Sequence, residues 1–260
     1  MQTTRPLTTL GRVTLVGAGP GDPELLTIKA LRAIREAEVV FVDDLVNPLI
    51  VEQVHSSARV IYVGKRGGCQ STPQSFILKS MVQAAKSGYQ VVRLKGGDPF
   101  MFGRGGEEIE YLQGHGIPCD VVPGITAGVA AMGALNTPLT QRGLAQGVLF
   151  VTGHNQEGSE GPDWKALGLL ARTQRMTLVI YMAMSHIEAI SQRLLESLPP
   201  DTAVAVVQHA TLPQQRHAAC RLSEVAQRVT AEGMGSPAVW VIGDVTAGLQ
   251  AHHAAITLCA

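Results

Sequence analysis

Cysteine is scarce in this chain of 260 residues, and the few cysteines are scattered. The four, Cys69, Cys119, Cys220 and Cys259, include no pair with CxxC spacing. The histidine pair at 252–253 has no third ligand type nearby. The sequence therefore indicates neither a disulfide framework nor a zinc site, and we expect no bound metal. Few cysteines and no disulfide pattern favour the reducing cytoplasm as the compartment.

Long apolar runs and net charge are lacking as well. No segment approaches the roughly 18 consecutive apolar residues of a membrane-spanning helix, and residues 1–11 lack the apolar core of a signal peptide. Twenty-one basic residues balance 21 acidic ones. This balance predicts neither a nucleic-acid partner nor a membrane-binding face, so any anionic ligand must be met by local cations.

Short apolar runs that alternate with helical periodicity fill most of the chain. We expect strands at 13–16, 39–42, 59–63, 91–94 and 119–122, each followed by a loop and a helical segment. This order predicts parallel βαβ units, and the length suits two medium domains. The predicted fold class is α/β, with an N-terminal domain of parallel strands at 1–122 and a C-terminal domain with a mixed sheet at 123–260.

The most unusual stretch is 91–108, VVRLKGGDPFMFGRGGEE, where an apolar strand runs into a loop of glycines and charged residues. The paired glycines at 96–97 allow backbone φ values that other residues disfavour, and Pro99 prevents further strand pairing. The loop therefore lies at the C-terminal end of a strand, which is where ligands bind in open α/β sheets. Residues 96–107 are the first candidate for an active site.

The loop at 17–22, Gly-Ala-Gly-Pro-Gly-Asp, resembles part of a dinucleotide-binding fingerprint. An acid at Asp43 or Asp44, roughly 20 residues on, suits the ribose of such a cofactor. The match fails in detail, because Asp22 stands where a glycine is needed and Pro20 removes a backbone donor. A nicotinamide-dependent reductase is therefore a minority alternative.

Several motifs in sequence order resemble those of the tetrapyrrole methylases. They are GAGPGDP at 17–23, DDLV at 43–46, VGKR at 63–66, RLKGGDPFMFGRGGEE at 93–108, VPGITA at 122–127, VTGH at 151–154, YM at 181–182 and PA at 237–238. The resemblance spans about residues 13–245. It implies two α/β domains of the tetrapyrrole methylase type, an active site in the cleft between them, S-adenosylmethionine as cofactor and a homodimer.

Within this family, the block at 93–108 looks like that of members that methylate uroporphyrinogen III. The resemblance then implies methyl transfer to carbons of rings A and B, through precorrin-1 to precorrin-2, in sirohaem, cobalamin or haem d1 biosynthesis. A related methylase that acts on a later precorrin is the alternative. The GAGPGDP motif does not separate the two, because family members with other substrates share it.

The resemblance also implies roles for individual residues. The expected cofactor-binding residues are Pro20, Gly96, Gly97, Asp98, Met101, Thr126, Ala127, Met182 and Ala210. The expected catalytic residues are Asp43, Lys65, Arg104 and Glu107. The expected substrate-binding residues are Arg66, Arg104, Gln141 and Arg142, because arginine forks suit the carboxylates of the tetrapyrrole.

Three positions near the expected tetrapyrrole site depart from the family pattern. Family members usually have Gly-Ile-Pro-Leu-Thr-His-Arg where this chain has Asn136-Thr137-Pro138-Leu139-Thr140-Gln141-Arg142. Gln141 keeps hydrogen-bonding capacity but does not titrate near neutral pH as a histidine does. Ala210 stands where glycine is frequent, and its methyl group narrows the expected cofactor pocket.

Overall fold

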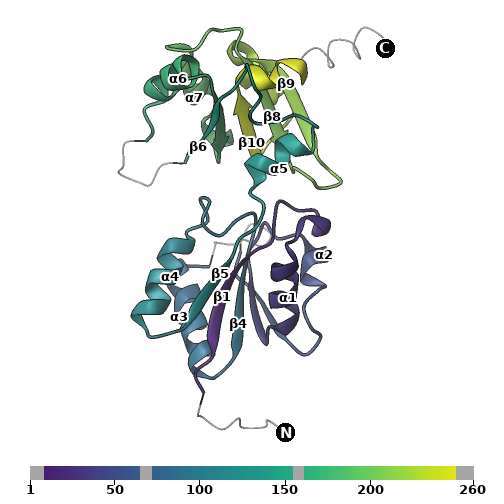
Figure 1. Ribbon diagram of the computed structural model, residues 1–260, viewed down its shortest axis with the longest axis vertical. Helices are drawn as coiled ribbons and strands as arrows, with labels where there is room; N and C mark the ends of the chain where they lie inside the picture. Colours follow the sequence, from purple (N-terminus) through teal and green to yellow (C-terminus); the bar gives the residue numbers. More distant parts are fainter. Residues whose placement is uncertain (1–8, 65–71, 155–160, 250–260) are drawn as a thin grey trace. The chain divides into compact units, whose positions relative to one another are not determined.

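The computed structural model describes residues 9–64, 72–154 and 161–249, and the chain forms two compact units. The first ends at Thr126 and the second begins at Ala127. The boundary expected from the sequence, between 122 and 123, lies a few residues earlier. Each unit is an α/β structure with its own five-stranded sheet (Figure 1).

The first unit has a fully parallel sheet, as the alternating pattern predicts. Its strand order is β3-β2-β4-β1-β5. The strands are β1 (Arg12–Gly17), β2 (Val39–Val42), β3 (Arg59–Tyr62), β4 (Gln90–Lys95) and β5 (Cys119–Val122). Their bounds agree with the expected strands to within one residue at each end, since apolar runs bounded by glycine and proline define them locally.

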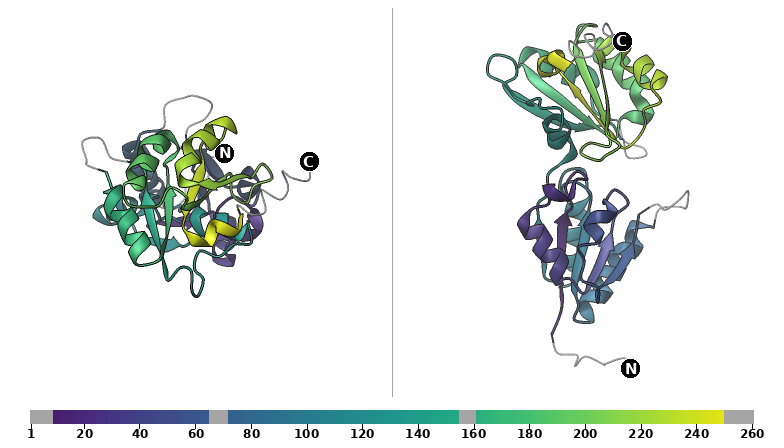
Figure 2. Two further views of the ribbon diagram at one scale, coloured as in Figure 1. Left: turned by 90° about the horizontal axis from the view of Figure 1, so that it is seen from above. Right: turned by 90° about the vertical axis from the view of Figure 1, so that its right-hand side faces the viewer.

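Helices cover both faces of this sheet (Figures 1 and 2). One face packs against α1 (Ile28–Glu36) and α2 (Pro48–Val51), and the other against α3 (Gln74–Lys86) and α4 (Gly105–Gly114). Alternate residues of each strand enter the two apolar clusters, which explains why most residues inside the strands are apolar.

From the sequence alone, Asp22 is a suitable cap for the helix that follows β1, and Pro23 suits its first turn. The structure places the start of α1 later. Asp22 instead caps the short 3₁₀ helix η1 (Pro23–Leu25), and α1 begins after Thr27, whose Oγ1 accepts from Ala30 N at 3.1 Å. The extended backbone at Leu26 and Thr27 separates the two helices, so the second cap defines α1.

The second unit has a mixed sheet of order β6-β7-β10-β8-β9, in which β6 and β7 are parallel and the other pairs antiparallel. The strands are β6 (Gly147–Thr152), β7 (Met176–Tyr181), β8 (Ala203–Gln208), β9 (Arg216–Arg221) and β10 (Ala238–Ile242). The helices are α5 (Ala127–Gly133), α6 (Trp164–Thr173), α7 (Ile187–Leu195) and α8 (Val225–Ala231). Short 3₁₀ helices lie at Met184–His186 (η2), Leu222–Glu224 (η3) and Asp244–Thr246 (η4).

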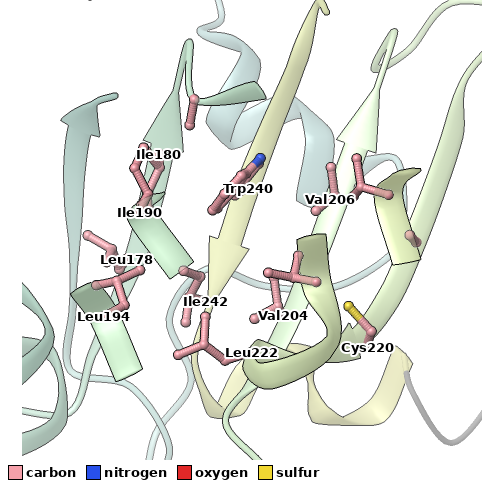
Figure 3. Packing of buried hydrophobic residues seen from close by; sticks show 14 of the residues in the cluster. Leu178, Ile180, Ile190, Leu194, Val204, Val206, Cys220, Leu222, Trp240 and Ile242 are labelled. Atoms are coloured by element: carbon pink, nitrogen blue, oxygen red, sulfur yellow. The ribbon is translucent and has the colours of Figure 1, made fainter. Parts of the chain in front are cut away.

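The main core of the second unit surrounds Trp240 of β10, which is fully buried. Leu178, Ile180, Val204 and Val206 from neighbouring strands point to the same side of the sheet (Figure 3). On the other side, α5 packs against the sheet through a small cluster that includes Val207 and Ala210. Among the described residues, no helix is long and apolar enough to cross a membrane.

Candidate functional site

The C-terminal edge of the first sheet gathers the loops that the sequence singled out. After β1 the chain passes to α1 on one face of the sheet, and after β4 it passes to α4 on the other face. Strands β1 and β4 are neighbours, so their loops diverge at a switch point in the sheet. Such a point is the usual ligand site of an open α/β sheet.

Two glycines hydrogen-bond these loops to each other. Gly19 N donates to the Gly97 carbonyl at 3.1 Å, and Gly97 N donates to the Gly19 carbonyl at 2.7 Å. Both residues have a positive φ, 71° and 65°, which disfavours other residue types. The structure thus brings the GAGPGDP and RLKGGDP motifs into direct backbone contact.

The loop after β5 also lies very close to the loops after β1 and β4, and glycine residues make this close approach possible. A Cβ on Gly124 would lie 2.2 Å from the Gly97 carbonyl oxygen, and one on Gly17 would lie 2.5 Å from Gly124 N. Only residues without a side chain allow the three backbones to approach this closely. Gly17 and Gly124 were not among the expected site residues, although both lie inside quoted motifs.

Asp98 fastens these loops through its carboxylate. Oδ1 accepts from Phe100 N at 2.8 Å, and Oδ2 accepts from Gly124 N at 3.0 Å. Each oxygen keeps a further lone pair for a ligand donor. Asp98 therefore organises the loops in addition to any contact that it makes with a cofactor.

The other expected cofactor residues of the first unit surround these loops. Pro20, Gly96, Met101 and Thr126 are half-buried. Met101 N donates to the Asp98 carbonyl at 3.3 Å, and a Cβ on Gly96 would lie 2.9 Å from Leu45 Cβ. All four lie after β1, β4 or β5, in the loops that meet at the switch point.

The first unit also has a cavity of about 320 Å³, lined mainly by residues that follow β2 and β3 and by the start of α3. Its walls bring together two expected catalytic residues, Asp43 after β2 and Arg104 before α4. Further lining residues are Asp44, Val63, Gly64, Thr72, Pro73, Gln74, Ile77 and Arg93. Lys65 and Arg66 lie outside the described residues.

Arg104 and Glu107, both expected in catalysis, form an exposed bidentate ion pair. Arg104 Nη2 lies 2.6 Å from Glu107 Oε2, and Arg104 Nε lies 3.1 Å from both carboxylate oxygens. The hydrogen bond from Arg104 lowers the pKa of Glu107, and the same bond raises the pKa of Arg104. These directions keep Arg104 a cation and disfavour it as a base.

Sequence reasoning missed a buried charge cluster between β4 and the helices α3 and α4. Arg93 Nε, Lys95 Nζ and Gln74 Nε2 all donate to Glu108 Oε1, at 3.4, 3.2 and 2.8 Å. The side chains of Arg93, Lys95 and Glu108 are at most 5 % exposed. Within the described part of the chain, Glu108 Oε2 has no hydrogen-bond partner.

One signal in the sequence pointed to this cluster: charged residues at alternate positions, 93 and 95, on a strand that is otherwise apolar. Alternate residues share a face of the sheet, here the face that α3 and α4 cover. Burial lowers the pKa of Lys95, the charge of Arg93 lowers it further, and Glu108 opposes both effects. The cluster therefore holds its cations in place at an energetic cost.

In the second unit, the expected cofactor residues lie at the ends of β7 and β8 and at the start of α5. Met182 follows β7, is 46 % exposed and has φ of 54°. Ala210 follows β8 and packs against Ala131 of α5. Ala127 opens α5, and the next residue, Gly128, donates from its N to Tyr181 Oη at 2.7 Å. The structure thus brings Ala127, Met182 and Ala210 to one region of this unit.

Gln141 and Arg142 lie in an exposed turn of the second unit. Gln141 pairs with Ala145 through two backbone hydrogen bonds, of 3.2 and 2.9 Å. The Leu139 carbonyl just before this turn accepts from Thr177 Oγ1 at 2.7 Å, which holds the segment on the sheet. Both side chains are accessible to a substrate.

The structure gives further reason to reject a dinucleotide site at residues 17–22. Asp22 Oδ1 accepts from Glu24 N at 2.9 Å, so a carboxylate occupies the helix start at which a pyrophosphate would bind. Within residues 9–64, 72–154 and 161–249, no three His, Cys, Asp or Glu side chains are grouped to hold a metal ion.

Comparison with known proteins identifies the family. The family model of the Tetrapyrrole (Corrin/Porphyrin) Methylases matches residues 12–226. Over 237 residues, the chain is 51% identical to uroporphyrinogen-III C-methyltransferase from Pseudomonas aeruginosa, covering 91% of this chain and 94% of that protein. Siroheme synthase from Azotobacter vinelandii is 48% identical, and the match covers 91% of this chain but 50% of that protein.

Solved structures agree with this relationship. Uroporphyrin-III C-methyl transferase from Thermus thermophilus, complexed with S-adenyl homocysteine, aligns with a TM-score of 0.75 and 41% identity, covering 90% of this chain and 98% of that one. A cobalt precorrin-4 methyltransferase aligns at 0.79 and 26% identity, covering 90% and 95%. The expected fold class is confirmed, and this chain belongs to the tetrapyrrole methylases.

Proposed function

We propose that this chain transfers methyl groups from S-adenosylmethionine to carbon atoms of uroporphyrinogen III. The observation that carries the proposal is the 51% identity to uroporphyrinogen-III C-methyltransferase from Pseudomonas aeruginosa, over 94% of that protein. The contact of three glycine loops at the switch point of the first sheet supports a cofactor site there.

The main task of the protein in this reaction is to align the methyl donor with the acceptor carbon. The sulfonium is already an electrophile, and a reduced pyrrole is an electron-rich carbon nucleophile. In each transfer the S–CH₃ bond breaks, a C–CH₃ bond forms, the donor becomes a neutral thioether, and the pyrrole loses a proton. A base placed to take that proton as the carbon attacks adds to the rate.

We assign donor binding to Pro20, Gly96, Gly97, Asp98, Met101 and Thr126 of the first unit and to Ala127, Met182 and Ala210 of the second. The glycines allow backbone groups to approach the donor, and the methionines offer polarisable apolar surface to its adenine. The demethylated donor bound by the Thermus thermophilus relative supports S-adenosylmethionine as the cofactor.

Substrate contacts and proton transfer we assign to the polar residues beside the donor loops. The substrate carries eight carboxylates, and the exposed guanidinium groups of Arg104 and Arg142 suit them. Asp43 lines the cavity and is the candidate base. Glu107 orients Arg104 through the bidentate ion pair. The catalytic role of Lys65 and the substrate-binding role of Arg66 remain predictions. The cytoplasmic location and the homodimer also remain predictions.

The finer product assignment is methylation of rings A and B to precorrin-2. That product precedes sirohaem, cobalamin and haem d1. Siroheme synthases among the relatives support the first pathway, and the structural likeness to a cobalt precorrin-4 methyltransferase supports the second.

The test is incubation of the purified chain with S-adenosylmethionine and uroporphyrinogen III without oxygen, followed by mass spectrometry. Two added methyl groups are the expected result. Donor binding without any methylation of uroporphyrinogen III contradicts the proposal. It favours the alternative of a methylase for a later precorrin, which the likeness to the precorrin-4 enzyme supports.

Substitutions distinguish the residues assigned to donor binding from those assigned to substrate contact. Arg104→Ala is expected to keep the affinity for S-adenosylhomocysteine and to reduce turnover. Asp98→Ala removes two loop hydrogen bonds and is expected to weaken that affinity at least tenfold, since each lost bond costs about 1 kcal/mol or more. Calorimetry checks both affinities, and wild-type donor binding by both variants with full activity contradicts these roles.

A further inference from the structure

Two of the residues that donate to Glu108, Arg93 and Gln74, line the cavity, and Arg93 is the charged one. Arg93 Nε lies 3.4 Å from Glu108 Oε1 in the core, and Arg93 Nη2 lies 3.6 Å from Asp43 Oδ1 at the cavity. The Arg93 side chain is 3% exposed, whereas that of Asp43 is 35% exposed. We propose that Arg93, held by Glu108, is a positioning residue that orients the carboxylate of Asp43 toward the substrate. This inference rests on the proposed function.

The geometry of Glu108 supports a positioning role. Gln74, Lys95 and Arg93 all donate to Oε1, and Oε2 has no partner within the described part of the chain. The carboxylate thus turns one oxygen toward the donors of α3 and β4. This arrangement fixes the Nε side of the guanidinium and leaves the Nη2 side toward Asp43.

Stability alone does not account for the cluster. Burying charged groups costs solvation that their attraction does not fully return, and apolar side chains of similar volume stabilise a core as well or better. Other inward residues of the first unit, such as Val91 on the same strand, are apolar. The ion pair of Arg93 and Asp43 at the edge of the cavity is explained if Arg93 fixes the orientation of a reacting carboxylate.

Among the described residues, Arg93 is the ion-pair partner that holds the side chain of Asp43. It begins the loop after β2, and the one ion pair of its carboxylate within the described part of the chain is that with Arg93. Its backbone is fixed, because Asp43 N donates to the Leu94 carbonyl at 3.0 Å. Loss of the Arg93 side chain therefore frees the carboxylate while its backbone stays in place.

Lys95 provides a matched control. It lies two residues further along β4, is equally buried and also donates to Glu108 Oε1, but it does not line the cavity. Arg93→Met and Lys95→Met each remove one buried cation from the same carboxylate. A purely structural cluster predicts the same behaviour from both variants.

The experiment compares kcat, KM for uroporphyrinogen III and donor affinity in both variants with the wild-type protein. Arg93→Met is expected to lower kcat roughly tenfold to a hundredfold, because a small misplacement of a reacting group has effects of that size. KM and donor affinity are expected to stay within about twofold, since the substrate and donor contacts remain. Lys95→Met is expected to retain kcat. Equal losses of kcat, or none, overturn the inference.

Crystal structures of the variants test the inference whatever the substrate is. The Asp43 carboxylate is expected to change rotamer in Arg93→Met and to stay in place in Lys95→Met. An unmoved carboxylate in Arg93→Met overturns the positioning role, whereas absence of methyl transfer by the wild-type protein overturns only the proposed function. Should Arg93→Met not fold, Arg93→Lys keeps the charge near Glu108, and we expect it to fold without recovering kcat.

Discussion

The two units use their interiors differently. The first buries Arg93, Lys95 and Glu108, whereas the polar residues buried in the described part of the second, Thr177, Ser191, Gln208 and Thr246, are uncharged. The charges of the first unit lie between its sheet and two helices and connect to the candidate site through Arg93. The first unit thus places charged groups in its interior beside the cavity, whereas the buried residues in the described part of the second are apolar or uncharged.

Left-handed backbone positions lie after strands in both units. In the first unit, left-handed positions beside the site belong to glycines such as Gly19 and Gly97 and also to Phe102 and Arg104, with φ of 55° and 60°. In the second, Met182, His209 and Thr211 adopt φ between 51° and 68° after β7 and β8. A left-handed conformation lowers the folding stability at a non-glycine residue, and such residues occur where a side chain is needed at that position. Glycines that allow close backbone contact are a feature of the loops of the first unit, whereas strained non-glycine positions occur near strand ends in both units.

The largest expected effect comes from filling the contact of the three glycine loops. In Gly124→Ala the new Cβ meets the Gly97 carbonyl oxygen, a backbone atom that cannot move alone. We expect a loss of more than about 4 kcal/mol in the free energy of unfolding. Denaturant titration measures it. The control is Gly106→Ala, whose Cβ meets nothing within 4 Å, with an expected change below about 1 kcal/mol.

The next effect tests the contrast between charged and uncharged interiors. Glu108→Ala leaves Arg93 and Lys95 buried without their shared carboxylate, and we expect a loss of about 3–5 kcal/mol. Thr177→Val in the second unit removes one buried hydrogen bond and is expected to lose about 1 kcal/mol. Equal losses in chemical denaturation contradict the contrast.

A smaller effect concerns Cys220, a buried thiol of the second unit. Burial raises its pKa from 9.0 to about 11. Below pH 9 both states keep the proton, and between pH 9 and 11 the unfolded chain loses it first. The stability contribution is therefore lost as the pH rises through this range, on the order of 2 kcal/mol. The measurement is the free energy of unfolding at pH 8 and pH 10.5 in the wild-type protein and in Cys220→Ala. Between these two pH values, the free energy of unfolding must decrease less in the variant than in the wild-type protein.

The smallest effect on stability tests the strained backbone of the second unit. Met182→Gly relieves a left-handed conformation at an exposed position, and we expect a gain of about 0.5–1 kcal/mol together with weaker donor binding. Arg175→Gly relieves a similar φ of 51° away from the expected site. It is expected to gain stability without loss of donor affinity, and thermal unfolding with calorimetry separates the two variants. Unchanged donor binding in Met182→Gly argues against its assigned role.

Sequence reasoning located most strands because their evidence is local. The run at 39–42 and its neighbours are bounded by turn residues, and the structure confirms them. The start of α1 was misplaced, because Asp22 and Thr27 are both good caps and the path of the chain decided between them. The ionic cluster was missed, since Glu108 reaches β4 only after α4 packs on the sheet.

By itself the sequence determined the family, the alternation of strands and helices, and the gathering of glycine-rich and charged loops after parallel strands. Only the tertiary structure decided that Gly19 and Gly97 exchange hydrogen bonds, that Asp98 binds Gly124, and that Arg93 joins Glu108 to Asp43. The reason is physical. Strand formation depends on neighbouring residues, whereas burial, ion pairing and backbone contact depend on segments that meet only when the chain has folded.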